Sequence, residues 1–185
     1  LKQEQTTPSG TAGLAEQQPA VTQATVVEEV KRQLQAEMGL LPVQLLRDRR
    51  KSFVELYAYD NNGRSNYGTA GYLGNGYFVT VKHAVVALHP GEDDGRRIVS
   101  VKLRINRKDV LATVVDAGDA RTEVDPGDWA ILRVPRPVNL PPLRVNLGFS
   151  YDFADPIFRL GNDYSKGIIL STGYIGQRTA NDLVT

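Results

Sequence analysis

Two segments carry side chains that could cooperate in acid–base chemistry. Residues 74–83 read GNGYFVTVKH and end in His83; the sequence holds one other histidine. Residues 125–132 read DPGDWAIL, in which Asp128 stands between a Pro-Gly turn and an apolar run. A carboxylate that accepts a hydrogen bond from one imidazole nitrogen fixes the tautomer, so the other nitrogen can take a proton from a nucleophile. His83 and Asp128 are therefore the candidate catalytic residues, and Trp129 is expected to face away from Asp128 into the core.

The elements that would position these side chains have the period of β-strands. From Phe53 onward, short apolar runs end at close turns, which is typical of an all-β barrel or sandwich. Asn75-Gly76 is a strong hairpin signal, and a helical turn over Ala84–Leu88 would hold the imidazole at the rim of the strands. The expected strands are Phe53–Tyr59, Tyr67–Leu73, Tyr77–Thr80, Ile98–Ile105, Val110–Val115, Trp129–Val134, Leu143–Leu147, Pro156–Leu160 and Ile168–Ile175.

The first 52 residues differ in composition from the rest, because every aromatic residue lies at or after Phe53. Residues 1–24 are rich in Gln, Thr, Ala and Pro and cannot bury enough apolar area to offset their ordering entropy, so we expect a flexible extension. Residues 25–38 predict one short amphipathic helix, which either docks on another surface or is only partly formed within a linker that runs to residue 52. The basic run Arg47–Lys51 fits a solvated turn better than a binding patch.

Composition excludes several classes of function. The 185 residues contain no cysteine, which rules out a disulfide scaffold, cysteine-ligated zinc, an iron–sulfur cluster and a cysteine nucleophile. A net charge of +1 gives no electrostatic reason to expect a nucleic acid or an anionic membrane as a partner. No run approaches the roughly 18 apolar residues that a membrane span needs. Neither a metal ion nor a cofactor is expected.

Together the two segments resemble the trypsin-like serine peptidases of the chymotrypsin fold, especially the bacterial HtrA-type and related secreted members. In that family a G-x-G-[FY]-[LIV]-[VI]-T segment leads into the catalytic histidine, and D-[LIVW]-A-[LIV]-[LIV] begins at the catalytic aspartate. Residues 74–83 follow the first pattern except that Phe78 stands at its [LIV] position, and residues 128–132 match the second. The two segments come in the family's order, and a separation of 45 residues between His83 and Asp128 suits the family. Residues 167–175 (GIILSTGYI) are similar to a strand late in the family's second barrel.

The resemblance, which covers residues 53–185, implies two six-stranded Greek-key barrels. Residues 53–134 would form the first barrel, 135–144 a Pro-rich connector, and 145–185 the first part of the second barrel. Polypeptide substrates would be hydrolysed through an acyl-enzyme, with His83 as general base and then general acid and Asp128 orienting it. Because such peptidases are usually exported, an extracytoplasmic location, periplasmic or secreted, is expected. The start at Leu1 rather than Met suggests a processed or trimmed chain.

One part of the family pattern is absent from these residues. The family's nucleophile lies in a G-x-S-G-G segment, which also supplies the backbone N–H groups of the oxyanion hole, and no serine of the 185 residues has that context. We expect the serine and the remaining strands of the second barrel to come from sequence beyond residue 185, as a second chain or a C-terminal fragment. Residues 1–185 alone would then be inactive and aggregation-prone. Their exposed apolar face would include Ile157, Leu160, Ile169 and Tyr174.

Two other interpretations stay open. A chymotrypsin-fold domain that has lost its chemistry would bind or support other molecules without hydrolysing peptides. An unrelated β-sandwich could carry both segments by chance, which a fold determination would reveal. A G-x-S-G-G segment shortly after Thr185 would favour the peptidase over the non-catalytic domain.

Overall fold

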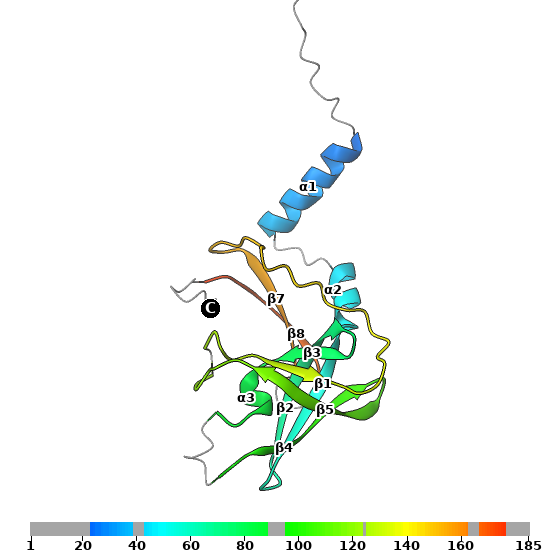
Figure 1. Ribbon diagram of the computed structural model, residues 1–185. Coiled ribbons are helices and arrows are strands. Elements are labelled where there is room, and N and C mark those ends of the chain that lie inside the picture. Colours follow the sequence, from blue (N-terminus) through cyan, green and yellow to red (C-terminus); the bar gives the residue numbers. More distant parts are fainter. Residues whose placement is uncertain (1–22, 39–42, 89–94, 124, 163–166, 177–185) are drawn as a thin grey trace, which may run out of the picture. The chain divides into compact units, whose positions relative to one another are not determined.

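The computed structural model describes residues 23–38, 43–88, 95–123, 125–162 and 167–176 (Figure 1). The chain divides into two compact units, Leu1–Leu40 and Leu41–Thr185. Residues 1–22 of the expected flexible extension lie outside the described residues. Within the described ranges, no helix is both long enough and apolar enough to cross a membrane.

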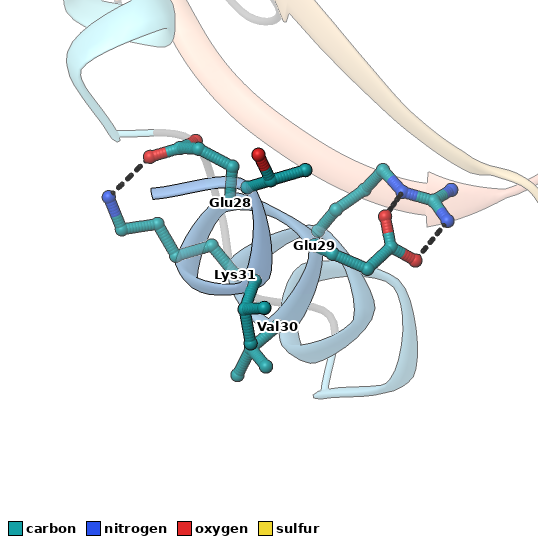
Figure 2. A pocket seen from close by; sticks show the side chains of 7 residues that line it. Glu28, Glu29, Val30 and Lys31 are labelled. Atoms are coloured by element: carbon teal, nitrogen blue, oxygen red, sulfur yellow. Dashed lines mark hydrogen bonds and ion pairs between the residues drawn. The ribbon is translucent and has the colours of Figure 1, made fainter. Parts of the chain in front are cut away.

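The first unit holds helix α1 (Gln23–Met38), over the stretch where an amphipathic helix is expected. On its surface, Lys31 pairs with Glu28 at 2.8 Å and Arg32 pairs with Glu29 at 2.6 Å (Figure 2). Pairs three residues apart favour the helix only modestly here, because all four side chains are exposed to solvent and its ions. Val26, Val27 and Val30 on α1 are each about half exposed.

The second unit begins with a helix where a linker and a solvated turn are expected. Helix α2 spans Val43–Arg50 and contains most of the basic run. The Asp48 carboxylate accepts hydrogen bonds from the side chains of Gln44, at 3.3 Å, and Lys51, at 3.2 Å. Good helix formers, Gln, Leu and Arg, fill most of this stretch, so local preference and side-chain pairing produce a helix without a clear apolar period.

Six strands of the second unit form a closed antiparallel barrel in the order β1-β2-β3-β6-β5-β4, and β1 pairs with β4 to complete the ring (Figure 1). Strand β4 therefore lies beside β1 while β1, β2 and β3 follow one another, which is a Greek key. The predicted all-β barrel is confirmed. The strands are β1 (Phe53–Asp60), β2 (Ser65–Gly74), β3 (Tyr77–Thr80), β4 (Ile98–Ile105), β5 (Lys108–Ala117) and β6 (Ala130–Arg133).

Strands β2 and β3 are joined by the two-residue turn that the Asn-Gly pair predicts. Asn75 has a φ of 51° and Gly76 a φ of 82°, as a type I′ turn requires at both of its central positions. A Cβ atom on Gly76 would lie 3.0 Å from the carbonyl oxygen of Val134. The backbone N–H of Val134 donates to the Gly76 carbonyl at 2.9 Å, so the glycine also lets the end of β6 approach the hairpin.

The barrel core follows from strand alternation. Every second residue of β1 is buried, and the residues between them are only half-buried. In β3 the buried positions are Phe78 and Thr80, and the ring centroid of Phe78 lies 5.0 Å from that of Tyr72 on β2. Aromatic pairs at this separation add to the stability gained from burial alone. The largest fully buried apolar side chains are Phe78, Leu56, Leu103 and Leu132.

The expected placement of Trp129 in the core is wrong. Trp129 is 39% exposed, whereas Ala130 and Leu132 are fully buried. Because successive residues of an extended chain face opposite sides, the residue before an inward-facing Ala130 must face outward. The indole lies over Gly118 instead, where an added Cβ would come within 2.8 Å of Nε1.

A separate two-stranded antiparallel sheet follows the barrel in sequence. It consists of β7 (Pro156–Gly161) and β8 (Ile169–Tyr174). Three of the four side chains expected on an exposed apolar face, Ile157, Ile169 and Tyr174, are 39–63% exposed, and Leu160 is half-buried. That this sheet belongs to a second barrel stays a prediction.

The expected strand at Leu143–Leu147 is wrong, because the structure has an irregular segment there. Leu143 packs over β2, where a Cβ on Gly71 would lie 2.6 Å from its side chain. Its N–H donates to the Tyr72 carbonyl at 2.7 Å. Beyond it, the Asn146 side chain accepts from the N–H of Gly148 at 3.1 Å and closes a turn. The polar turn and the prolines just before Leu143 interrupt strand pairing.

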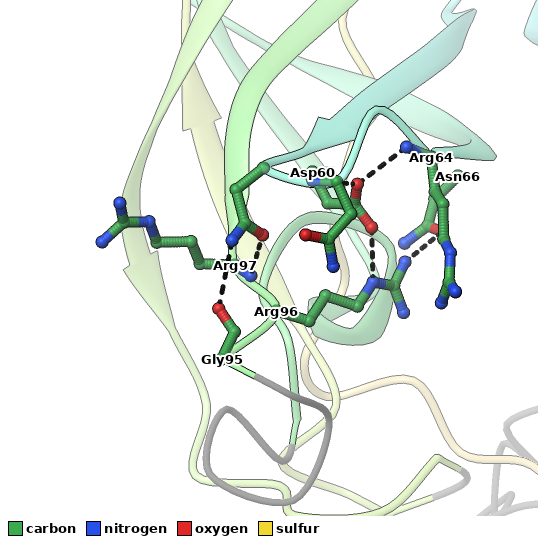
Figure 3. Close-up of polar contacts among 8 residues, drawn as sticks. Asp60, Arg64, Asn66, Gly95, Arg96 and Arg97 are labelled. Atoms are coloured by element: carbon green, nitrogen blue, oxygen red, sulfur yellow. Dashed lines mark hydrogen bonds and ion pairs between the residues drawn. The ribbon is translucent and has the colours of Figure 1, made fainter.

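A buried carboxylate joins the β1–β2 turn to the start of β4. The side chain of Asp60 is fully buried and its Oδ2 accepts from Nε of Arg96 at 2.8 Å (Figure 3). Its Oδ1 accepts from the backbone N–H groups of Asn62 at 3.0 Å and Arg64 at 2.7 Å. Burial by itself raises the pKa of Asp60, but the hydrogen bonds from Arg96 and the two backbone N–H groups outweigh it, so the pKa lies below its usual value.

Replacing Asp60 with Asn should lower the free energy of unfolding at neutral pH and weaken its dependence on acid. A carboxyl group whose pKa is lower in the folded chain stabilises the fold above its unfolded-state pKa of about 4, and this contribution is lost as pH falls through the folded value. Urea unfolding between about pH 6 and pH 2 measures the effect. Asp116→Asn, which removes an exposed carboxylate on β5 whose described hydrogen bond is to a neighbouring backbone N–H, is the control. Equal acid dependence in wild type and Asp60→Asn would contradict the prediction.

Candidate active site

His83 lies in a short helical turn that directly follows β3. Helix α3 spans Lys82–Val85, and the N–H of Val86 donates to the Lys82 carbonyl at 2.8 Å. Ala84 and Val85 are buried, so their packing fixes the turn against the barrel. The expected turn over Ala84–Leu88 is therefore displaced toward the N-terminus, and His83 is inside the turn rather than before it.

The structure brings the two sequence-predicted site residues together. Nδ1 of His83 lies 2.6 Å from Oδ2 of Asp128, and the backbone N–H of His83 donates to Oδ1 of the same carboxylate at 2.9 Å. The Asp128 side chain is 7% exposed and the His83 side chain is 34% exposed. Two hydrogen bonds to one carboxylate hold the imidazole in a single orientation and engage Nδ1, which leaves Nε2 as the nitrogen for proton exchange with another group.

Asp128 is held by a tight turn within the β5–β6 connection. The Asp125 carboxylate accepts from the N–H of Gly127 at 2.8 Å, and the Asp125 carbonyl accepts from the N–H of Asp128 at 2.9 Å. The two sides of the connection approach so closely that a Cβ on Gly118 would lie 2.0 Å from the carbonyl oxygen of Gly127. Only glycine fits at position 118, and this close approach brings the Asp128 carboxylate to the barrel rim.

Lys82 links α3, which carries His83, to the β5–β6 connection, which carries Asp128. Its Nζ donates to the carbonyl of Ala120 at 2.8 Å, across the gap between α3 and the β5–β6 connection. Ala120 is buried at 2% exposure, so the lysine satisfies a carbonyl that water does not reach. Sequence reasoning missed this role, because a lysine beside a histidine has no distinctive spacing and its partner is a backbone atom.

A small cavity of about 290 Å³ opens beside the imidazole. This volume is at the lower limit of small-molecule sites, so it suits one or two side chains of a polypeptide better than a large cofactor. Among the described residues, no group of three or more His, Cys, Asp and Glu side chains could hold a metal ion. The cavity is lined by Asn66, His83, Ala87, Leu88, Arg96, Ile98, Thr122 and Glu123.

Comparison with known proteins gives structural matches without sequence matches. No protein-family model matches the chain, and no curated protein matches its sequence. The serine endoprotease from Yersinia pestis is similar, with a TM-score of 0.58 and 19% identity over 77% of this chain and 47% of that one. The HtrA-type protease AlgW with a tripeptide has a TM-score of 0.58 and 18% identity over 76% of this chain and 41% of that one.

The inactive form of the Rv3671c protease is also similar, with a TM-score of 0.53 and 20% identity over 74% of this chain and 57% of that one. The chain spans about half the length of these three structures, 41–57% of each. At this level of identity the comparison concerns the fold, and it shows that the chain has the fold of the trypsin-like, HtrA-type serine proteases.

Proposed function

We propose that this chain is the acid–base portion of a trypsin-like serine endopeptidase, with polypeptides as its substrates. The hydrogen-bonded pair of His83 and Asp128, 2.6 Å apart at the rim of a barrel with this fold, is the observation that supports the proposal most strongly. The resemblance of the two sequence segments to the same proteases is a second, independent support. We infer an extracytoplasmic location from that resemblance.

In the proposed reaction, Nε2 of His83 takes the proton of a serine hydroxyl while the serine oxygen attacks the carbonyl carbon of the scissile peptide. The imidazolium that forms is stabilised by Asp128, which keeps its own negative charge. Nε2 then gives the proton to the leaving amine, and the C–N bond breaks to leave an acyl-serine. His83 next removes a proton from water, which attacks the ester and regenerates the serine.

The proposed serine comes from a polypeptide segment outside residues 1–185, because no serine in this sequence stands in a G-x-S-G-G context. The same segment, on this gene product or on a second chain, would add strands to the β7–β8 sheet. The apolar side chains exposed on that sheet, Ile157, Phe158, Ile169 and Leu170, are 37–42% exposed and suit such pairing. The alternative candidate is a non-catalytic domain with the same fold. The absence of a G-x-S-G-G segment from residues 1–185 favours this alternative.

A fluorophosphonate probe, which reacts only with an activated serine, tests the proposal directly. The natural gene product is labelled in its folded state, digested, and mapped by mass spectrometry, with heat-denatured protein as the control. We expect one labelled serine, located outside residues 1–185. Absence of labelling together with absence of casein hydrolysis would favour the non-catalytic domain. A label on a serine within residues 1–185 would overturn the proposed origin of the nucleophile.

A further inference from the structure

Asn162 is a buried polar residue without a hydrogen-bond partner for its side chain. It directly follows β7 and is 4% exposed. Neither Oδ1 nor Nδ2 has a partner within the described part of the chain. Buried side-chain amides are nearly always paired in folded proteins, so an orphaned amide is a reason to look for a missing partner.

The surroundings of Asn162 connect it to the strand that leads to His83. The backbone N–H of Asn162 donates to Oγ1 of Thr69 on β2 at 2.6 Å. The carbonyl of Thr69 accepts from Oγ1 of Thr80, the last residue of β3, at 2.9 Å. Asn162 is thus fixed at the contact between the two sheets, two hydrogen bonds away from the residue that ends β3 just before α3.

The chemistry of the free amide limits what can pair with it. Oδ1 accepts and Nδ2 donates, so together they match the N–H and the carbonyl of one extended residue, which point to the same side of its backbone. The group is neutral, and no charged side chain shares a hydrogen bond with it in the described ranges. A polypeptide main chain therefore fits this site better than an anion or a cation does.

We propose that the Asn162 amide hydrogen-bonds the main chain of the segment that carries the nucleophile and so positions the serine against His83. The inference rests on the proposed function, which brings that segment within about 3 Å of Nε2 of His83. In this role Asn162 is a positioning residue, since it touches the segment and not the reacting atoms. Ser52, whose buried Oγ also lacks a partner, lies between α2 and β1. Its carbonyl accepts from the N–H of Tyr72, near the β2–β3 turn and not near the end of β3 that leads to His83.

The test compares Asn162→Leu with wild type in the natural gene product, using a peptide substrate. Asn and Leu have similar shapes, so the substitution removes two hydrogen-bonding atoms without leaving a large cavity. We expect kcat to fall about 10- to 100-fold with KM nearly unchanged, since misplacement of a reacting group by about 1 Å has effects of this size. The urea midpoint should change little or rise, and Ser52→Ala, the matched control, should leave kcat unchanged.

The outcomes separate the inference from the proposed function. A wild-type protein without any peptidase activity overturns the proposed function, and this inference with it. An active wild type with an equally active Asn162→Leu variant overturns the inference alone. A fall in kcat that is accompanied by a matching fall in the urea midpoint also overturns it, because the amide would then support the fold in general.

Discussion

Replacing His83 with Ala in the protein that carries the nucleophile should lower kcat for peptide hydrolysis by about a millionfold, as loss of the histidine does in well-studied serine proteases. The imidazole is oriented by a buried carboxylate and is itself partly open to solvent, so it can exchange a proton with the serine. Without it, the serine keeps its proton. Steady-state kinetics with a fluorogenic peptide measure the loss, and KM should change far less than kcat.

Asp128→Asn should have a smaller effect than His83→Ala in the same assay and lower kcat by about ten-thousandfold. An amide at this position cannot accept from Nδ1 and from the backbone N–H of His83 as the carboxylate does, so the tautomer is no longer fixed. Asp116→Asn is the matched control, because Asp116 is an exposed carboxylate on β5 whose one described hydrogen bond is to the neighbouring backbone N–H. A kcat within a few-fold of wild type for Asp128→Asn would contradict the assigned orienting role.

Phe78→Ala should destabilise the barrel by about 3–5 kcal/mol, which is the usual cost of removing a fully buried phenylalanine. Phe78 is completely buried and packs against Tyr72 with ring centroids 5.0 Å apart. Urea unfolding followed by the fluorescence of Trp129, the single tryptophan, measures the change. Trp129 is well placed to report it, because it lies between Asp128 and the first residue of β6.

Tyr77→Ala is the control for this prediction. Tyr77 is the neighbouring residue of β3 and is 36% exposed, with the guanidinium of Arg133 5.6 Å from its ring centroid. We expect a smaller loss of stability than for Phe78→Ala, because Tyr77 is partly exposed and leaves no enclosed cavity when it is truncated. Equal losses for the two variants would mean that β3 does not present Phe78 to the core in the way described.

The barrel and the acid–base pair could be predicted from sequence because both depend on local rules. Alternation along a strand decides which side chains are buried, and Asn75-Gly76 decides how β2 turns into β3. His83 and Asp128 were identified because each belongs to a short segment that resembles the trypsin-like peptidases, in which the two residues act together. None of these inferences needed the position of a distant part of the chain.

The features that sequence reasoning missed depend on contacts that no local pattern encodes. The unexpected helix α2 forms from side-chain pairs around Asp48 rather than from an apolar period. Leu143 leaves the strand pattern because it packs over a glycine of β2. The orphaned amide of Asn162 becomes visible only when burial and partners are both known. The side on which Trp129 lies depends on the register of β6, which the position of Asp128 alone does not fix.

The place of β6 in the barrel sets the order in which the site can be assembled during synthesis. β6 is the last barrel strand to leave the ribosome, yet it lies between β3 and β5, so the ring stays open until it inserts. Asp128 immediately precedes β6, and the same insertion therefore carries the carboxylate to His83. A nascent or partly folded chain with an open barrel has an unoriented imidazole. Under the proposed function, acid–base competence is therefore coupled to completion of the barrel, and a chain with an open barrel would be inactive.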